Sequence, residues 1–339
     1  MVRRIAVFAV LCAIGCFGPR LERSALDGWH AVEVNGVRMV AETSARDLHE
    51  LARDLAGFDA AFALVMGRQL PATTPTAIAL IRDAELKRRF RVGPWLPDVA
   101  LTTPDGSLAL VEVFEDPAET RQMLFYQCTR LLLSRHDARV SRWFSEGLGL
   151  YFSTLAYRDG ALVVGSVPAL LLAWVVKRDP IPLAQLFAWD RETNPRSPAT
   201  VDLRATSWAV VHLLRQTAKG RSELASFEME LAKGAPLEQA REAAFGRSFA
   251  QLDAELAAHL GPLSRGVAAV SVFDPKQVAI SEPPGAVPLR RSEVARELAA
   301  IALAVNSASV GTRKDIDARA RLARELLEIA AEEDPAGER

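Results

Sequence analysis

A chain of 339 residues, half of them hydrophobic, has enough apolar material for one large core or two modest ones. Its 41 Lys and Arg side chains are balanced by 42 Asp and Glu side chains, so no net field attracts nucleic acid or an anionic surface. We therefore expect no nucleic-acid partner.

The first sixteen residues have the pattern of an export signal. Arg3 and Arg4 precede an apolar stretch over residues 5–14 that is too short to span a bilayer, and a small residue precedes Cys16. Residues 13–16 resemble the lipobox of bacterial lipoproteins, whose cysteine is diacylated and becomes the new N-terminus. We expect residues 1–16 to direct export, and Cys16 to anchor the protein to a membrane of the cell envelope or periplasm. Ordinary cleavage and an uncleaved N-terminal anchor are the open alternatives.

Residues 17–29 are expected to be a tether, and residues 30–115 a small α/β unit. Asn35-Gly36 is a strong turn signal inside a hairpin over 31–40. Leucine and phenylalanine recur every three or four residues over 44–66, which predicts an amphipathic helix. A strand over 76–81, a short helix over 84–90, and a strand pair over 99–103 and 108–114 complete the unit.

The chain is predicted to become helical over residues 116–262. Helices are expected over 118–134, 141–155, 167–177, 183–189, 206–218, 222–233, 237–245 and 249–260, with a short hairpin turn at Asp159-Gly160. Ser248 and Gln251 have the spacing of a helix-capping pair. An irregular connector is expected over 263–288.

The C-terminal residues 289–339 are predicted to form a helical hairpin that resembles one tetratricopeptide unit. Its helices are expected over 292–305 and from Thr312 to Asp334, with Asp315 in capping-box position. A single such unit cannot bury its apolar face alone, so it must pack on the body, on a partner or on a second copy. The fold class expected for the whole chain is α+β.

Two segments have the layout of a zinc-peptidase site. In a His-Glu-x-x-His helix, two histidines four residues apart lie on one face and bind zinc, and the intervening Glu activates a water molecule. The segments Tyr126–Leu133 and Arg142–Phe152, followed by 206–214 and 244–253, resemble the active-site helices and later helices of a gluzincin-like bacterial family of largely unknown function. The likeness covers residues 30–262.

Most of the zinc-binding and catalytic residues that the resemblance implies are replaced in this chain. Tyr126 stands where the first histidine belongs, Gln127 replaces the general base, and Arg130 replaces the second histidine. A neutral phenol is a poor zinc ligand, and a guanidinium has no lone pair to donate. Glu146, the third ligand in the family, remains. We therefore expect neither metal nor cofactor and no catalysis.

The same residues could instead be ordinary helix positions, and the spacing to Glu146 decides between the two interpretations. A buried Glu146 without a partner would be costly. The sequence therefore predicts an ion pair between Arg130 and Glu146 at the place of the metal.

The remaining candidates are weaker. A cleft next to the strand before the motif helix would be lined by Trp143, Ser107, Leu108, Leu110 and His212, with an extended peptide added to that strand. By itself His212 is more readily explained as a hydrogen-bonded core histidine, and Cys128 as a buried small hydrophobe. His136 suits a helix C-terminus.

The function expected from these observations is that of an exported, lipid-anchored pseudo-peptidase that binds a peptide or protein through the vestigial cleft or the C-terminal hairpin. The rivals are an active metal-dependent hydrolase with unrecognised ligands and a structural scaffold of the envelope.

Overall fold

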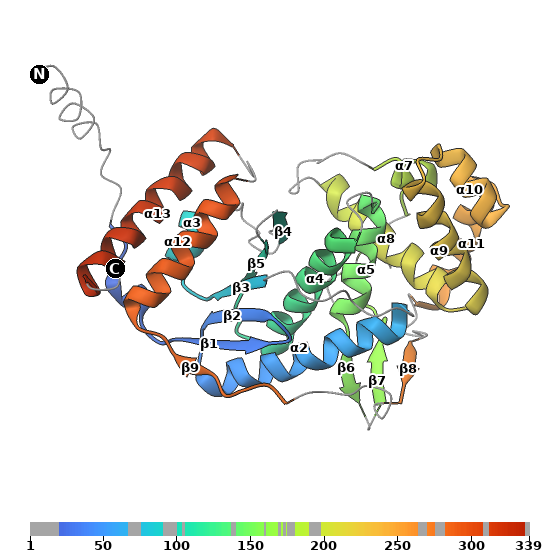
Figure 1. The fold of residues 1–339 in the computed structure, drawn as a ribbon. Helices are drawn as coiled ribbons and strands as arrows, with labels where there is room; N and C mark the ends of the chain where they lie inside the picture. Colours follow the sequence, from blue (N-terminus) through green and yellow to red (C-terminus); the bar gives the residue numbers. More distant parts are fainter. Residues whose placement is uncertain are drawn as a thin grey trace, which may run out of the picture.

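The structure of the protein, a computed structural model, describes residues 20–66, 76–90, 100–103, 106–136, 140–158, 161–168, 171, 174, 180–189, 198–263, 270–274, 282–307 and 312–335. The fold is α+β, as the sequence predicts, with a mixed sheet in the N-terminal part and a helical region after it (Figure 1). The predicted signal segment with Cys16 lies outside the described residues.

Six strands form the main sheet, in the order β4-β5-β3-β2-β1-β9. They are β1 (Trp29–Val34), β2 (Val37–Glu42), β3 (Thr76–Ile81), β4 (Ala100–Thr103), β5 (Gly106–Glu112) and β9 (Val287–Pro288). Strands β2, β3 and β5 are parallel to one another, whereas β1, β4 and β9 each run antiparallel to the neighbour they pair with. The predicted hairpin turn is confirmed, because Asn35 and Gly36 have φ values of 50° and 73°, which a tight turn between twisted strands requires.

Helices cover both faces of this sheet. On one face, α2 (Ala45–Met66) and α4 (Pro117–His136) share a core with alternate strand residues, among them Val32, Met39, Ile78 and Val111. On the other face, α3 (Ala84–Phe90), α12 (Arg291–Ser307) and α13 (Arg313–Glu333) pack on the intervening residues, among them Ala31, Val40, Ala79 and Leu110 (Figure 1). The alternation follows from the two-residue period of a strand.

The helical region continues the first of these two cores. It contains α5 (Arg142–Ser153), α7 (Leu183–Phe187), α8 (Pro198–Arg215), α9 (Ala218–Ala232), α10 (Leu237–Phe245) and α11 (Phe249–Leu263). A second sheet, in the order β6-β7-β8, joins β6 (Ala156–Arg158) and β7 (Ala161–Val164) to β8 (Ser271–Phe273). The strands around the predicted turn at Asp159-Gly160 are present, while the turn itself lies outside the described residues.

Both predicted capping pairs are present. Thr312 and Asp315 form a complete capping box at the start of α13. Before α11, the backbone N–H of Ser248 donates to Gln251, and the backbone N–H of Gln251 donates to Ser248 Oγ at 3.2 Å. These local signals predict where the two helices begin because they involve only neighbouring residues.

Four expectations need correction. The described part of the predicted tether is packed on the body, with Leu21 and Leu26 buried and a 3₁₀ helix η1 (Arg23–Leu26). The predicted connector contributes β8 and β9 to the two sheets. Helix α8 begins at Pro198 rather than at Thr206. Of the predicted helix over 167–177, Leu171 and Trp174 are helical, Val167 is not, and most of the rest lies outside the described residues.

Candidate functional site

Helix α5 lies against α4 on one side and α8 on the other, and its glycines make this close approach possible. A Cβ atom at Gly147 would lie 2.5 Å from the carbonyl oxygen of Ser207 on α8, and one at Gly149 would lie 2.8 Å from the ring of Tyr126 on α4. Both distances are too short for a side chain, so glycine is required at both positions. The Gly147-x-Gly149 spacing therefore serves helix packing.

Glu146 lies where these three helices meet and is 1% exposed. The Tyr126 hydroxyl donates a hydrogen bond to Glu146 Oε2. Arg130 Nε lies 3.8 Å from Glu146 Oε1, which confirms the predicted ion pair. A second guanidinium is closer, with Arg204 Nε of α8 3.3 Å from Glu146 Oε2. The buried carboxylate thus has a cation within ion-pair distance of each oxygen.

The charge of Glu146 is maintained by its neighbours. Burial alone would raise the pKa of the carboxyl, but Arg130, Arg204, the Tyr126 hydroxyl and Arg142 together lower that pKa below its usual value. Glu146 is therefore ionised at neutral pH although it is shielded from water.

Two more polar side chains belong to this cluster. Gln127 is fully buried, and its Oε1 accepts a hydrogen bond from Arg130 Nη1 at 3.3 Å. Arg142, the first residue of α5, has its guanidinium 4.9 Å from the ring centre of Trp189. We call Tyr126, Gln127, Arg130, Arg142, Glu146 and Arg204 the Glu146 cluster.

The Glu146 cluster does not fit a zinc ion. The Tyr126 hydroxyl donates a hydrogen bond to the carboxylate, and the two guanidinium groups have no lone pair to donate and would repel a dication. Gln127 has no basic group with which to take a proton from water. Within the described part of the chain, no three His, Cys, Asp or Glu side chains come together as metal ligands could.

Arg204 was not found by sequence reasoning. It precedes Ser207, Trp208 and Val211 by three, four and seven residues, and so lies on the face of α8 that packs against α5. An arginine at the start of an apolar helix face is the signal that could have identified it. The signal was missed because α8 was expected to begin after it.

The predicted peptide-binding edge is wrong. Strand β5 is not at the edge of the sheet, because β4 pairs with it over Gly106–Ala109, so that Thr102 faces Ser107 and Leu101 faces Leu108. Ser107, Leu108 and Leu110 are all buried. Backbone groups already paired with β4 cannot receive an added strand along this stretch.

The other two residues assigned to the cleft are core residues. Trp143 is buried and stacks on Phe187, with ring centres 4.5 Å apart. His212 is buried beside Trp208, and its Nδ1 lies 2.7 Å from Nε2 of His259 on α11. The interpretation of His212 as a hydrogen-bonded core histidine is confirmed, whereas its pairing with His259 was not anticipated.

Cys128 is buried and is not part of a disulfide, as expected for a small core side chain. His136 ends α4, and its side chain lies outside what the structure describes.

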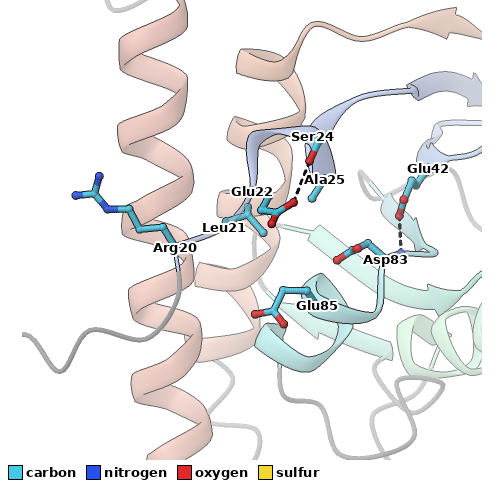
Figure 2. Close-up of a pocket in the computed structure, with 8 residues that line it drawn as sticks. All are labelled: Arg20, Leu21, Glu22, Ser24, Ala25, Glu42, Asp83 and Glu85. Carbon is cyan, nitrogen blue, oxygen red and sulfur yellow. Dashed lines mark hydrogen bonds between the residues drawn. The ribbon is translucent and has the colours of Figure 1, made fainter.

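A cavity of about 390 Å³ lies far from the Glu146 cluster in sequence, between residues 20–25 and the ends of β2 and β3. Figure 2 shows that Glu22, Asp83 and Glu85 line it together with Glu42, while the Arg20 side chain points away. Most of these carboxylates already have partners. Glu42 accepts the backbone N–H groups of Arg82 and Asp83, and Asp83 accepts that of Leu86 at the start of α3. The acidic lining is explained by helix and strand ends.

None of the described helices is both long and apolar enough to cross a bilayer. Comparison of the chain with protein-family profiles and with curated protein sequences found no match.

Proposed function

We propose that this protein is a catalytically inactive, peptidase-like protein, exported and anchored to a membrane through Cys16, that acts by binding a peptide or protein. The observation that supports inactivity is the Glu146 cluster, in which Arg130 and Arg204 provide the positive charge that a metal ion would otherwise bring. The cluster joins α4, α5 and α8, so the residues at the motif positions have a structural role.

Hydrolysis of a peptide needs an activated water molecule and a group that stabilises the developing oxyanion. Glu146 is engaged by Tyr126 and two arginines, and Gln127 cannot act as a base. Nothing in this arrangement activates water.

Metal analysis of the purified protein tests the proposal. We expect no stoichiometric zinc and no peptide hydrolysis that a chelator blocks. Stoichiometric zinc together with chelator-sensitive hydrolysis would instead support the rival, an active hydrolase.

A reconstructed ligand set provides the matched control. The triple variant Tyr126→His, Gln127→Glu, Arg130→His restores the motif beside Glu146, and a fourth change, Arg204→Leu, removes the remaining cation. Because Arg204 lies 3.3 Å from the carboxylate, we expect zinc binding by calorimetry in the quadruple variant and much weaker binding in the triple variant. Equal binding by both would contradict the role given to Arg204.

A structural role in the envelope is the second candidate, favoured by the burial of all five residues expected to line a cleft. Hydrogen exchange of the protein with a pool of extended peptides distinguishes the two. Slower exchange in β4, which forms one end of the described sheet, supports peptide binding. Unchanged exchange throughout supports a scaffold.

A further inference from the structure

The first described residues of the chain are fixed to the folded body. The backbone N–H of Leu21 donates to Glu325 on α13, and the Leu21 and Leu26 side chains are buried in the core that α12 and α13 form with the sheet. The ion pair of Asp27 with Arg291 and that of Arg23 with Glu332 join the same segment to α12 and α13. Burial of the two leucines supplies most of the stabilisation, since exposed ion pairs contribute little.

Chain length then limits how far Cys16 can be from this point. Only five residue steps separate Cys16 from Leu21, and a fully extended chain spans at most about 3.6 Å per residue, or roughly 18 Å. A compact protein of this size has a radius of gyration of roughly 20 Å, and so a diameter well beyond that reach. An acyl group on Cys16 would hold the body close to the membrane and in one orientation.

We propose that the end of the molecule formed by η1, α13 and α3 faces the membrane, and that α9, α10 and α11 point away from it. This inference rests on the anchored state in the proposed function, and not on the chemistry of the Glu146 cluster. Figure 1 shows α3, α12 and α13 at one end of the molecule and α9–α11 at the other, and η1 contacts α12. The cavity beside Arg20, Leu21 and Glu22 (Figure 2) then opens near the lipid headgroups.

The charges at this end indicate what kind of membrane contact it makes. Acidic and basic side chains are balanced there: α13 carries five basic and six acidic residues, and Arg23 pairs with Glu332, Arg291 with Asp27 and Arg88 with Glu85. Balanced charges create no net basic surface that would attract anionic lipids. Attachment is therefore due to the acyl chains on Cys16, and it should not depend on salt or on the anionic lipid content.

Fluorescence quenching in vesicles tests the orientation. The full-length protein, processed in a bacterial host and reconstituted in phosphatidylcholine vesicles that contain a headgroup quencher, is labelled at one introduced cysteine. Ser24→Cys places the dye at the proposed membrane-facing end, and Lys219→Cys places it on α9, where the native side chain is 78% exposed. Both native positions are exposed, and the remaining Cys128 is buried.

We expect the dye at position 24 to lose most of its emission and the dye at position 219 to keep it, with no change when anionic lipid or salt is added. Equal quenching of both dyes, or stronger quenching at 219, would overturn the orientation while leaving the anchor intact. A variant that lacks residues 1–16, and with them both the apolar stretch and Cys16, should not bind the vesicles. If it stays bound with the wild-type quenching pattern, or if the wild-type protein does not bind vesicles, the anchor itself is refuted. None of these results bears on the zinc measurements, so failure of the two proposals can be told apart.

Discussion

Glu146 shows how a buried carboxylate retains its charge without a metal ion. Two guanidinium groups and a phenol hydroxyl surround it, and together they outweigh the cost of removing it from water. The arginines keep 19% and 20% of their side chains exposed, so they bridge between the buried carboxylate and solvent. Replacing a single member of such a group leaves the other charges without their partner.

The substitution Glu146→Gln should therefore destabilise the protein by about 3 kcal/mol, the lower end of the range for a broken buried ion pair. The lower end applies because the arginines are partly hydrated. Urea denaturation measures the change. The matched control is Glu238→Gln, which breaks the ion pair of the largely exposed Glu238 with Arg241 and should leave the midpoint nearly unchanged. Equal midpoints for the two variants would show that Glu146 is not paired as described.

The stability of the protein should depend on pH because of His259. Burial lowers the pKa of this imidazole below its ordinary value of 6.5, so the unfolded chain binds the proton more readily than the folded one. The free energy of unfolding is therefore greatest above pH 6.5 and falls as the pH drops below it, with a slope of at most about 1.4 kcal/mol per pH unit for one proton.

Chemical denaturation between pH 5 and 8 should show this slope for the wild-type protein and a reduced slope for His259→Gln. His49→Gln serves as a control, since His49 lies on α2 away from the His212–His259 pair. An unchanged slope in His259→Gln would mean that the group responsible is another one.

At the scale of elements, the contact between α5 and α8 depends on Gly147. A methyl group there would meet the Ser207 carbonyl oxygen at 2.5 Å and Val211 Cγ2 at 2.7 Å. The carbonyl oxygen belongs to the backbone of α8 and cannot move away without a shift of that helix, so the helices would separate and the Glu146–Arg204 distance would grow.

Gly147→Ala should cost about 1–3 kcal/mol, as overpacking of a core does. Gly285→Ala is the matched control, because Gly285 is exposed, has no positive φ and has nothing within 4 Å of the added methyl group. It should be neutral or slightly stabilising, since alanine restricts the unfolded chain more than glycine does. Thermal unfolding of both variants measures the difference. A Gly147→Ala protein as stable as the Gly285→Ala protein would contradict the close contact.

At the scale of the whole molecule, the C-terminal hairpin is part of the fold. The hairpin could bury its apolar face on the body, on a partner or on a second copy. In the structure it packs on the sheet of the N-terminal part, so the two ends of the chain form one core. Arg319 of α13 contributes to this contact, since it is buried and donates to the carbonyl of Phe90 at the end of α3.

Two leucines of α12 test this arrangement. Leu298→Ala, at a fully buried position against the sheet, should destabilise the protein by about 2–5 kcal/mol. Leu303→Ala, on the same helix but 49% exposed, should have a much smaller effect. The free energy of unfolding from urea titrations compares them. If the hairpin were an independent unit, the hairpin of the Leu298→Ala variant would unfold in a separate transition, and the unfolding transition of the sheet would not change.

The sequence by itself determined most of the local structure. The Asn35-Gly36 hairpin, the strand over 76–81, the helix over 237–245 and the capping box at Thr312 all depend on residues close in the chain. The pairing of Arg130 with Glu146 was also predicted, because the resemblance to a two-helix zinc-peptidase site implies that both residues face the place of the metal. What the sequence could not supply were contacts between residues distant in the chain: Arg204 with Glu146, His212 with His259, β9 beside β1, and the hairpin on the sheet. Periodicity indicates which face of an element is apolar but not which element will cover it. Which element covers it depends on how all the apolar faces pack together in the tertiary structure.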